Sequence, residues 1–272
     1  MLSDAVPSRA PRRISSRNNP NIARYRAAAR GETPDRILLD GPHLVADALA
    51  KGLPLESAAI LSTAIERPEV RRLMAELERI GVDVVVTTAE VMAVVSPVRS
   101  SSAIVALAPR PAAEPGRLYA GNAPLVLIAH DVQDPGNMGA IVRAAEAGHA
   151  TSVIAAGACA DPFGWKALRG SSGSALRLPI GAASTAAVAV AEARRHGCRV
   201  IATVPRGGRS LYDVDLRSGA AILIGGEGPG LDATTIELAD ERLTIPMQAP
   251  VESLNAAVAA AIVVYEALRQ RR

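Results

Sequence analysis

The sequence predicts an α/β protein with two domains in one chain of 272 residues. Short apolar runs typical of strands alternate with alanine-rich or amphipathic stretches typical of helices from residue 36 to the end. A chain of this length can bury two separate cores. A glycine-rich turn directly after the apolar run 221–224 indicates a ligand-binding loop at the carboxyl end of a strand.

The composition limits both the core and the partners. Hydrophobic residues make up 49% of the chain, which excludes general disorder, and aromatic residues only 2%. The core must therefore consist of Ala, Val, Leu and Ile, and base stacking on aromatic side chains cannot be the main mode of RNA contact. The net charge is +3, and apart from Lys51 and Lys166 every basic residue is arginine, whose planar guanidinium binds two phosphate oxygens.

The two cysteines indicate no metal site and no disulfide. Cys159 and Cys198 form no C-x-x-C pair, so we expect reduced core thiols. The first residues lack the apolar core of a signal peptide, and no apolar run reaches the length of a membrane span. We therefore expect a cytoplasmic protein without membrane or metal partners.

Residues 1–30 are predicted to be a basic N-terminal arm, with a helix over 21–30. Asp4 is their single acid, against Arg9, Arg12, Arg13, Arg17, Arg24, Arg26 and Arg30. One interpretation is an arm that grips RNA phosphates, in which Arg12, Arg13, Arg17 and Arg24 bind RNA. The other is a tail that only increases solubility.

Residues 31–109 are predicted to be a small α/β domain. Strands are expected at 37–39, 58–61, 82–87 and 104–107, and helices at 42–51, 69–80 and 89–95. His43, near the start of a helix, fits a surface or capping residue better than a catalyst. The Pro-, Gly- and Ala-rich stretch 110–122 is predicted to be a linker, with the boundary near Arg117.

Residues 123–272 are predicted to be a second α/β domain. Strands are expected at 125–129, 152–155, 199–203, 221–224 and 243–245, and helices at 138–147, 162–168, 185–196 and from 254 onward. The unbroken apolar run at 125–129 is typical of a central parallel strand. Asn137 occupies the expected N-cap of the helix that follows it.

The glycine loop differs from both standard phosphate loops. Its glycines do not fit G-x-G-x-x-G, and it lacks the Gly-Lys-Ser/Thr sequence. Glu227, the only charge in the loop, would repel a phosphate. A neutral or cationic cofactor is expected instead, and the positive sulfonium of S-adenosylmethionine suits that chemistry.

Three segments carry a resemblance to a known family. DPGNMGAIVRAAEAG (134–148), GGEGPGL (225–231) and IPM with VESLNAAVA (245–247 and 251–259) resemble the three signature motifs of the SpoU (TrmH) branch of the SPOUT superfamily. Their order over roughly 120 residues makes this signal far more specific than any single motif. ILLDGPHLVADAL (37–49) resembles the start of the substrate-binding domain, of ribosomal-protein-like fold, that precedes the catalytic domain in many SpoU enzymes.

The resemblance implies a 2′-O-ribose RNA methyltransferase that uses S-adenosylmethionine, with a trefoil knot in its C-terminal domain and a homodimeric active unit. It implies these catalytic residues: Asn137, Arg143, Glu227, Ser253 and Asn255. It implies these cofactor contacts: Ala202, Thr203, Gly225, Gly226, Gly230, Ile245, Met247 and Leu254. Arg169, Ser171 and Gly173 match the family's shorter R-x-S-x-G stretch, and Arg169 is an expected RNA contact.

Three further questions stay open at this point. Family accounts make the Arg143 equivalent the base, but a guanidinium hardly deprotonates in proteins, so a phosphate clamp that stabilises the developing alkoxide is preferred. Large-subunit ribosomal RNA is the expected substrate. The alternatives are a tRNA methyltransferase, a non-catalytic RNA-binding protein of the same fold, or a nucleotide-dependent oxidoreductase. Arg206 and Arg209 belong either to an RNA contact or to a solvated loop.

Overall fold

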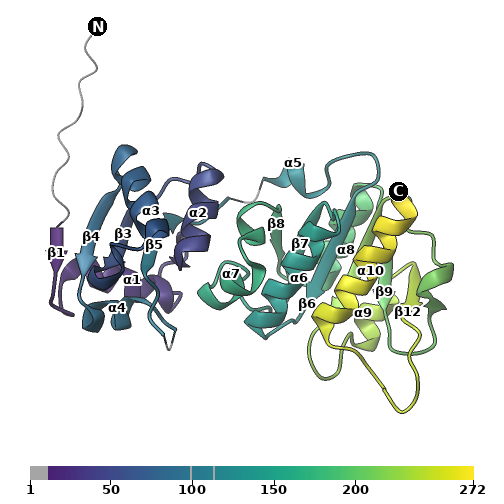
Figure 1. Cartoon of the computed structure of the whole chain (residues 1–272). Coiled ribbons are helices and arrows are strands. Elements are labelled where there is room, and N and C mark those ends of the chain that lie inside the picture. The colour runs from purple at the N-terminus through teal and green to yellow at the C-terminus, as the bar shows by residue number, and fades with distance from the viewer. Residues whose placement is uncertain (1–11, 99, 113) are drawn as a thin grey trace, which may run out of the picture. The chain divides into compact units, whose positions relative to one another are not determined.

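The computed structural model describes residues 12–98, 100–112 and 114–272. The chain divides into two compact units, Met1–Pro111 and Ala112–Arg272, each with its own sheet (Figure 1). The division lies inside the stretch 110–122 that was predicted to be a linker. The predicted α/β class is confirmed.

The first unit is built on a five-stranded mixed sheet in the order β1-β4-β3-β5-β2. Its strands are β1 (Arg12–Ile14), β2 (Arg36–Asp40), β3 (Ser57–Leu61), β4 (Asp83–Thr87) and β5 (Ile104–Pro109). Its helices are α1 (Pro20–Ala29), α2 (Pro42–Ala50), the 3-10 turn η1 (Ser62–Ala64), α3 (Pro68–Arg79) and α4 (Ala89–Val95). Strands β1, β4 and β3 are parallel, whereas β5 runs antiparallel to both β3 and β2.

Residues 12–30 belong to this unit and do not form the separate arm that the arginines suggested. β1 extends the sheet by pairing with β4, and α1 packs on β2 and α4. Ile14, Ile22 and Tyr25 are buried, and the Tyr25 hydroxyl donates to Ser57 Oγ at 2.9 Å. These three apolar residues anchor the segment between exposed arginines. The part of the predicted arm before residue 12 lies outside the described residues.

The second unit is built on a seven-stranded parallel sheet in the order β10-β12-β9-β11-β6-β7-β8. Its strands are β6 (Leu125–His130), β7 (Ser152–Ala156), β8 (Ile180–Ala183), β9 (Arg199–Thr203), β10 (Arg209–Ser210), β11 (Ala220–Gly225) and β12 (Glu241–Thr244). The predicted central strand, β6, is confirmed: residues 125–129 are fully buried. β6 and β11 pair from Leu125 and Ala220 to His130 and Gly225, so their carboxyl ends coincide.

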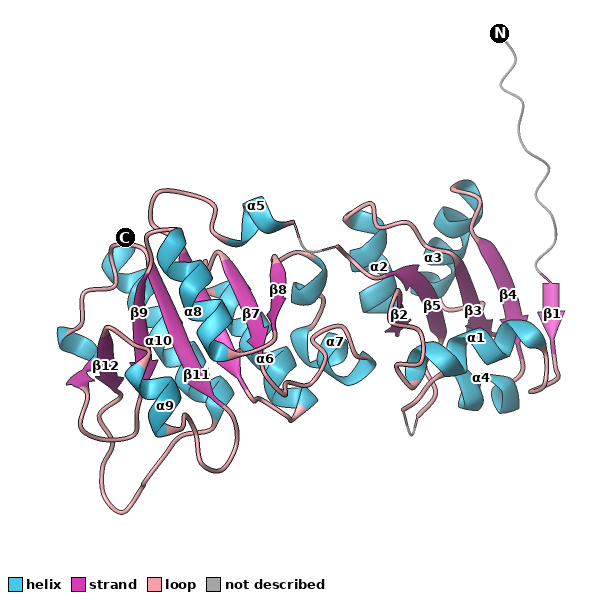
Figure 2. Ribbon diagram, turned by 180° about the vertical axis from the view of Figure 1, so that it is seen from behind, coloured by secondary structure: helices cyan, strands magenta, loops and turns pink. Residues whose placement is uncertain are grey.

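Helices cover both faces of this sheet (Figures 1 and 2). They are α5 (Pro115–Leu118), α6 (Pro135–Ala147), α7 (Trp165–Ser171), α8 (Ala186–Arg195), α9 (Ala233–Glu237) and α10 (Ala256–Arg271), with the 3-10 turns η2 (Ser174–Leu176) and η3 (Leu211–Asp213). α10 packs on α6 and β11, and α6 packs on α7. α8 packs on the strands from the opposite face, over a core of alanine and branched aliphatic residues. The expected aliphatic core is confirmed.

Two glycines allow the close packing of α6. A Cβ at Gly139 would lie 2.4 Å from the carbonyl oxygen of Ala167 in α7, and a Cβ at Gly148 would lie 2.0 Å from Val264 Cγ1 in α10. A larger side chain at Gly139 would require the main chain of α7 to shift, and one at Gly148 would require Val264 to move. These contacts fix α6 between α7 and α10.

Several short elements escaped the sequence prediction, among them β1, β8, β10, α5 and α9. Each has two to five residues, too few for a helical or strand period to emerge. None of the helices formed by the described residues is long and apolar enough to cross a membrane.

Candidate active site

A cavity of about 350 Å³ opens at the carboxyl ends of β9, β11 and β12. Its wall comes from the loop after β9, the glycine loop after β11, the loop after β12 and the start of α10. The lining residues are Thr203, Val204, Pro205, Ile224, Gly225, Gly226, Glu227, Gly228, Pro229, Gly230, Leu231, Ile236, Leu243, Ile245, Met247, Ser253, Leu254, Asn255, Ala256 and Ala259. The cavity thus lies where open α/β sheets bind their ligands.

All the predicted cofactor residues except Ala202 line this cavity. Ala202 is fully buried in β9, where it packs in the core beneath α8. The sequence reasoning missed Leu231, which simply continues the glycine loop, and Ile236, which α9 contributes. A five-residue helix gives no sequence signal that could have identified Ile236.

Backbone crowding explains why the loop after β11 is rich in glycine. A Cβ at Gly226 would lie 2.0 Å from the carbonyl oxygen of Asp131, and one at Gly225 would lie 2.5 Å from the carbonyl carbon of Gly230. Gly228 and Gly230 have φ values of +86° and +69°, which favour glycine. The loop therefore closes tightly on itself and on the end of β6.

A chain of side-chain hydrogen bonds joins three segments at the edge of the cavity. Asn255 Nδ2 donates to Asn137 Oδ1 at 2.9 Å, and Asn137 Nδ2 donates to Glu227 Oε1 at 2.5 Å. Glu227 Oε2 accepts from the main-chain N–H of Gln133 at 3.1 Å. We call Glu227, Asn137 and Asn255 the polar network. It connects the glycine loop, α6 and α10, which lie far apart in the sequence.

Helix capping fixes the direction of these hydrogen bonds. Asn255 is the N-cap of α10: its Oδ1 accepts from the N–H groups of Ala257 (2.9 Å) and Val258 (3.3 Å). Its Nδ2 must therefore face Asn137, which accepts with its oxygen and donates with its nitrogen. The last acceptor then has to be a group such as a carboxylate, which Glu227 supplies.

Asn137 is not the N-cap of α6, so that prediction is wrong. The cap is Asp134, whose Oδ1 accepts from the main-chain N–H of Asn137 at 2.8 Å, with Pro135 at the first helical position. Asp134 frees the side chain of Asn137 for the polar network. An Asp followed by Pro is itself a helix-start signal, and Asp134 and Pro135 carry this signal in the sequence.

Hydrogen bonding keeps Glu227 ionised. Partial burial alone would raise its pKa, but donation from Asn137 and from main-chain N–H groups outweighs that effect and lowers the pKa below the usual 4.5. Since the pKa is depressed in the folded protein, this stabilisation is present at neutral pH. It is lost only as the pH falls through the lowered pKa.

Comparison with known proteins gives the family. The model of the SpoU rRNA Methylase family matches residues 124–265, which hold the cavity and the polar network. An uncharacterized tRNA/rRNA methyltransferase of Synechocystis sp. is 32% identical over 263 residues, covering 95% of this chain and 94% of that protein. The chain belongs to the SpoU family.

Named relatives of this SpoU protein act on RNA. The 23S rRNA (guanosine(2553)-2′-O)-methyltransferase RlmP of Bacillus subtilis is 31% identical, over 84% of this chain and 87% of that protein. Among solved structures, the SpoU methyltransferase AviRb from Streptomyces viridochromogenes in complex with AdoMet matches with a TM-score of 0.84 and 26% identity. The match covers 93% of this chain and 98% of AviRb. An RNA 2′-O ribose methyltransferase matches with a TM-score of 0.81 and 30% identity, over 95% and 99%.

Two of the five predicted catalytic residues stand apart from the polar network. Arg143 is exposed on α6 and makes no hydrogen bond or ion pair with any residue that the structure describes. It follows Asn137 by six residues and so lies on another side of the helix. Ser253 lines the cavity but forms no hydrogen bond within the described part of the chain. The Glu227 carboxylate binds Asn137 and does not contact Arg143.

The predicted RNA-binding arginines of the first unit divide into two classes. Arg12 forms an ion pair with Asp83 (2.9 Å), and Arg24 forms one with Glu56 (2.6 Å). Arg13 and Arg17 are exposed and form no ion pair within the described ranges. Of these four arginines, only this second pair forms no ion pair, and Arg17 still interacts electrostatically with Glu90.

The remaining candidates are surface residues. Arg169 is exposed in the last turn of α7, which packs on α6. His43 is exposed and lies 3.6 Å from Asp47, in agreement with a surface role. Arg206 is exposed, and Arg209 lies 3.5 Å from Glu241.

Both cysteines are free thiols. Cys198 is buried, as predicted for a core thiol, whereas Cys159 is only half-buried, and burial raises the pKa of both. Burial therefore disfavours their reactive thiolate form. Among the described residues, His, Cys, Asp and Glu form no group of three or more that could hold a metal ion.

Proposed function

We propose that this SpoU protein transfers a methyl group from S-adenosylmethionine to the 2′-oxygen of a ribose in RNA. The observation that carries the proposal is the polar network at the edge of the cavity, where Glu227, Asn137 and Asn255 meet from three segments. Membership of the SpoU family and the AdoMet complex of AviRb support it.

The lining of the cavity fits this cofactor. Ile224, Leu231, Leu243 and Ile245 offer apolar walls for an adenine, and the glycine loop exposes main-chain groups. Neither lysine nor arginine occurs among the described residues that line the cavity, and Glu227 adds negative charge there. This charge suits a sulfonium and opposes the pyrophosphate of a nicotinamide dinucleotide, so the oxidoreductase alternative loses its support. When bound, S-adenosylmethionine supplies an electrophilic methyl group.

The protein's part in the reaction is positioning. Each amide of the polar network uses one N–H within the chain and retains another that can bind a ribose or phosphate oxygen. The ionised Glu227 holds both amides in one orientation before RNA binds. The two side chains therefore need little further ordering when the transition state forms. Arg143, exposed and uncommitted, is free to bind the RNA phosphate and to stabilise the developing alkoxide.

The active unit in this proposal is a homodimer whose C-terminal domain carries the trefoil knot of the family. Val258 and Tyr265 on α10 are 46% and 53% exposed, and the half-buried Ala261 and Ile262 lie between them on one helical face. A second copy of the chain would cover this apolar face. Arg143, on the adjacent helix α6, would then lie near the interface. Sedimentation of a fully active monomer would contradict this part of the proposal.

RNA binding is assigned mainly to the first unit, as the substrate-binding domain of ribosomal-protein-like fold. Its exposed Arg13 and Arg17 support that role. Arg12 and Arg24 would have to leave Asp83 and Glu56 to reach a phosphate, so we expect them to contribute less. Arg169 is the corresponding candidate in the second unit.

The proposed substrate is large-subunit ribosomal RNA, with tRNA as the alternative. The 23S rRNA specificity of RlmP, which aligns with most of this chain, favours ribosomal RNA. The test is to map 2′-O-methyl positions in total RNA with and without the gene. Loss of one position in large-subunit RNA is the expected result. Loss of a 2′-O-methyl position in tRNA instead would show that tRNA is the substrate.

A further inference from the structure

The last turn of α10 lies at the opposite end of the sheet from the polar network. α10 starts next to Asn255 and has 16 residues, which corresponds to about 24 Å at 1.5 Å per residue. Arg271, in the last turn, contacts Ala123, two residues before β6, and Ser218, two residues before β11. The helix therefore runs from the carboxyl ends of these strands back to their starting ends.

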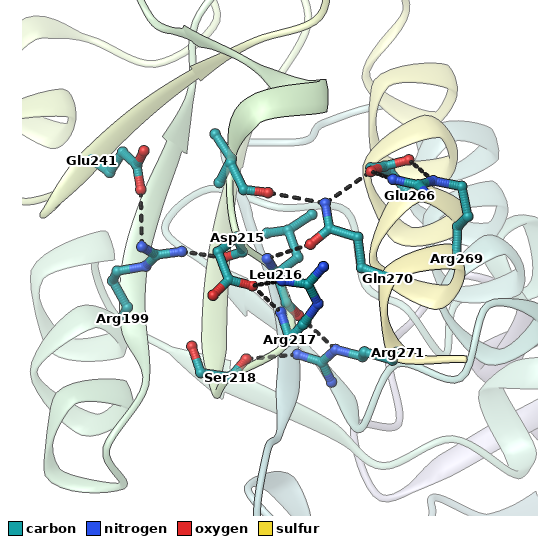
Figure 3. A network of polar contacts seen from close by, with 11 residues as sticks. Arg199, Asp215, Leu216, Arg217, Ser218, Glu241, Glu266, Arg269, Gln270 and Arg271 are labelled. Atoms are coloured by element: carbon teal, nitrogen blue, oxygen red, sulfur yellow. Dashed lines mark hydrogen bonds and ion pairs between the residues drawn. The ribbon is translucent and has the colours of Figure 1, made fainter.

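The Arg271 guanidinium binds three main-chain carbonyl groups, and Figure 3 shows its contacts with Leu216 and Ser218. Nε donates to Leu216 (2.7 Å), Nη1 to Ala123 (2.7 Å) and Nη2 to Ser218 (2.8 Å). The planar fork of arginine suits such a contact, because its donors point to several acceptors in one plane.

Gln270 contacts the same loop. Its Oε1 accepts from the main-chain N–H of Leu216 at 2.8 Å, and its Nε2 donates to the Val214 carbonyl at 2.9 Å (Figure 3). We call the side chains of Gln270 and Arg271, with the main-chain groups that they bind, the carbonyl clamp.

The clamp is unusual because its charge has no carboxylate partner. Arg271 is partly buried, burial lowers its pKa, and it forms no ion pair with an acidic side chain in the described ranges. Burying an unpaired charge is unfavourable unless hydrogen bonds compensate. The compensation comes entirely from main-chain groups on two separate segments. The clamp therefore fixes the position of the last turn of α10 relative to these segments, which a surface ion pair would not do.

The three segments that meet at the clamp also deliver the polar network. β6 leads into α6 with Asn137, β11 leads into the glycine loop with Glu227, and α10 starts at Asn255. The clamp thus joins the starting ends of both strands to the far end of the helix. Any shift of α10 along its axis would change the distance between Asn255 and Asn137, now bonded at 2.9 Å.

The buried face of α10 gives only modest resistance to such a shift. Apart from Glu266 near its end, it consists of the small side chains of Ala257, Ala260, Val263, Val264 and Ala267. Small side chains interdigitate shallowly, and one specific contact, Val264 against Gly148, fixes the middle of the helix. The ends of the helix are held by the polar network and by the clamp.

We propose that Gln270 and Arg271 are positioning residues that hold α10 in the axial position where Asn255 reaches Asn137. As far as it concerns activity, this inference rests on the proposed methyl transfer. A hydrogen bond weakens steeply when its atoms separate by a further ångström, and a misplacement of that size can cost about 100-fold in rate. The clamp would therefore control the site from about 24 Å away.

The test compares Arg271→Met with Arg269→Met in the full-length protein. Arg269 is the control, because its guanidinium binds the Glu266 carboxylate, one turn earlier in the same helix, and not a main-chain group of the clamp. Glu266 Oε1 also accepts from Gln270 Nε2 at 2.8 Å, and Arg269→Met leaves both of these groups in place. The first readout is hydrogen exchange of the Ala257 and Val258 amides, which Asn255 caps. The second is kcat and KM for RNA methylation at saturating S-adenosylmethionine.

In Arg271→Met we expect exchange at both amides to rise about 10-fold over the control, and kcat to fall about 10- to 100-fold with KM for RNA unchanged. Faster exchange confined to residues 214–218 and 266–271, with the kcat of the control, would overturn the proposal. If Arg271→Met does not fold, Arg271→Lys decides by the same two readouts. If the wild-type protein methylates no RNA, the proposed function fails, while the exchange measurement still tests the clamp.

Discussion

At the scale of single residues, Asn255 combines three roles. Its oxygen caps α10, its nitrogen orients Asn137, and it lines the cavity. The first of these roles concerns stability, and the second concerns the site. A substitution that separates the two therefore tests the polar network more sharply than alanine does.

Asn255→Asp should keep the helix cap and disrupt the network. A carboxylate is as good an N-cap as an asparagine, so the free energy of unfolding should stay within about 0.5 kcal/mol of wild type. It cannot donate to Asn137, however, and methyl transfer should fall on the order of 100-fold. Asn255→Ala serves as control and should lose both the cap, about 1 kcal/mol, and the activity. Near-normal turnover in Asn255→Asp would contradict the role of the network.

Arg143 poses a different question, since it lies outside the cavity and the network. Arg143→Ala should lose on the order of 100-fold in methyl transfer, the scale of one lost transition-state donor, and bind the cofactor normally. Arg143→Lys should retain part of the activity with an unchanged pH–rate profile if the residue clamps phosphate. A shifted profile would identify it as the base. Loss of S-adenosylmethionine binding in Arg143→Ala would refute both roles.

At the scale of elements, the glycine loop shows how closely the sequence follows the backbone. Gly226 approaches the end of β6, and Gly225 approaches Gly230, so both positions lack room for a side chain. The loop carries Glu227 into the network and forms one wall of the cavity. A change in its path should therefore affect the cofactor and the network together.

Gly226→Ala should displace this loop. The added Cβ would lie 2.0 Å from the carbonyl oxygen of Asp131, and main-chain atoms cannot yield without a shift of the end of β6. We expect a loss of about 1–3 kcal/mol in the free energy of unfolding and weaker cofactor binding. Gly116→Ala is the control, because nothing lies within 4 Å of its added Cβ. Calorimetry and cofactor titration check both, and wild-type values for Gly226→Ala would refute this account of the loop.

The sequence predicted the residues of the site better than the contacts that hold those residues in place. Glycines after a strand and polar residues before an alanine-rich helix identified the loops that form the cavity. Ala202, which the family resemblance implies as a cofactor contact, does not line the cavity, because its side chain is buried in the core beneath α8. The N-terminal segment was misassigned because Ile14, Ile22 and Tyr25 are isolated between arginines. The carbonyl clamp could not be predicted from the sequence, because main-chain acceptors leave no pattern in it.

At the scale of the whole molecule, our proposal assigns cofactor binding to the second unit and RNA binding mainly to the first. The cavity and the polar network lie entirely in Ala112–Arg272, which has its own core. The described residues of the first unit include exposed arginines and none of the residues that line the cavity. Cofactor binding and RNA binding should therefore separate when the chain is cut between the units.

A fragment covering residues 112–272 should bind S-adenosylmethionine as tightly as the full chain and bind RNA far more weakly. RNA affinity of the full chain should also fall steeply as salt rises, because each phosphate contact releases counterions. Isothermal titration of both proteins at two salt concentrations measures these effects. Equal RNA affinity of fragment and full chain would contradict the division between the units.

The most direct measurement of the central claim is transfer of a labelled methyl group from S-adenosylmethionine to ribosomal RNA, comparing the wild-type protein with Glu227→Gln. Glutamine offers one acceptor oxygen where Glu227 accepts from both Asn137 and Gln133. With the wild-type protein, label should appear in an alkali-resistant 2′-O-methylated dinucleotide. Glu227→Gln should bind the cofactor and transfer on the order of 100-fold more slowly. Label on a base, no label on any RNA, or equal rates for the two proteins would contradict the account.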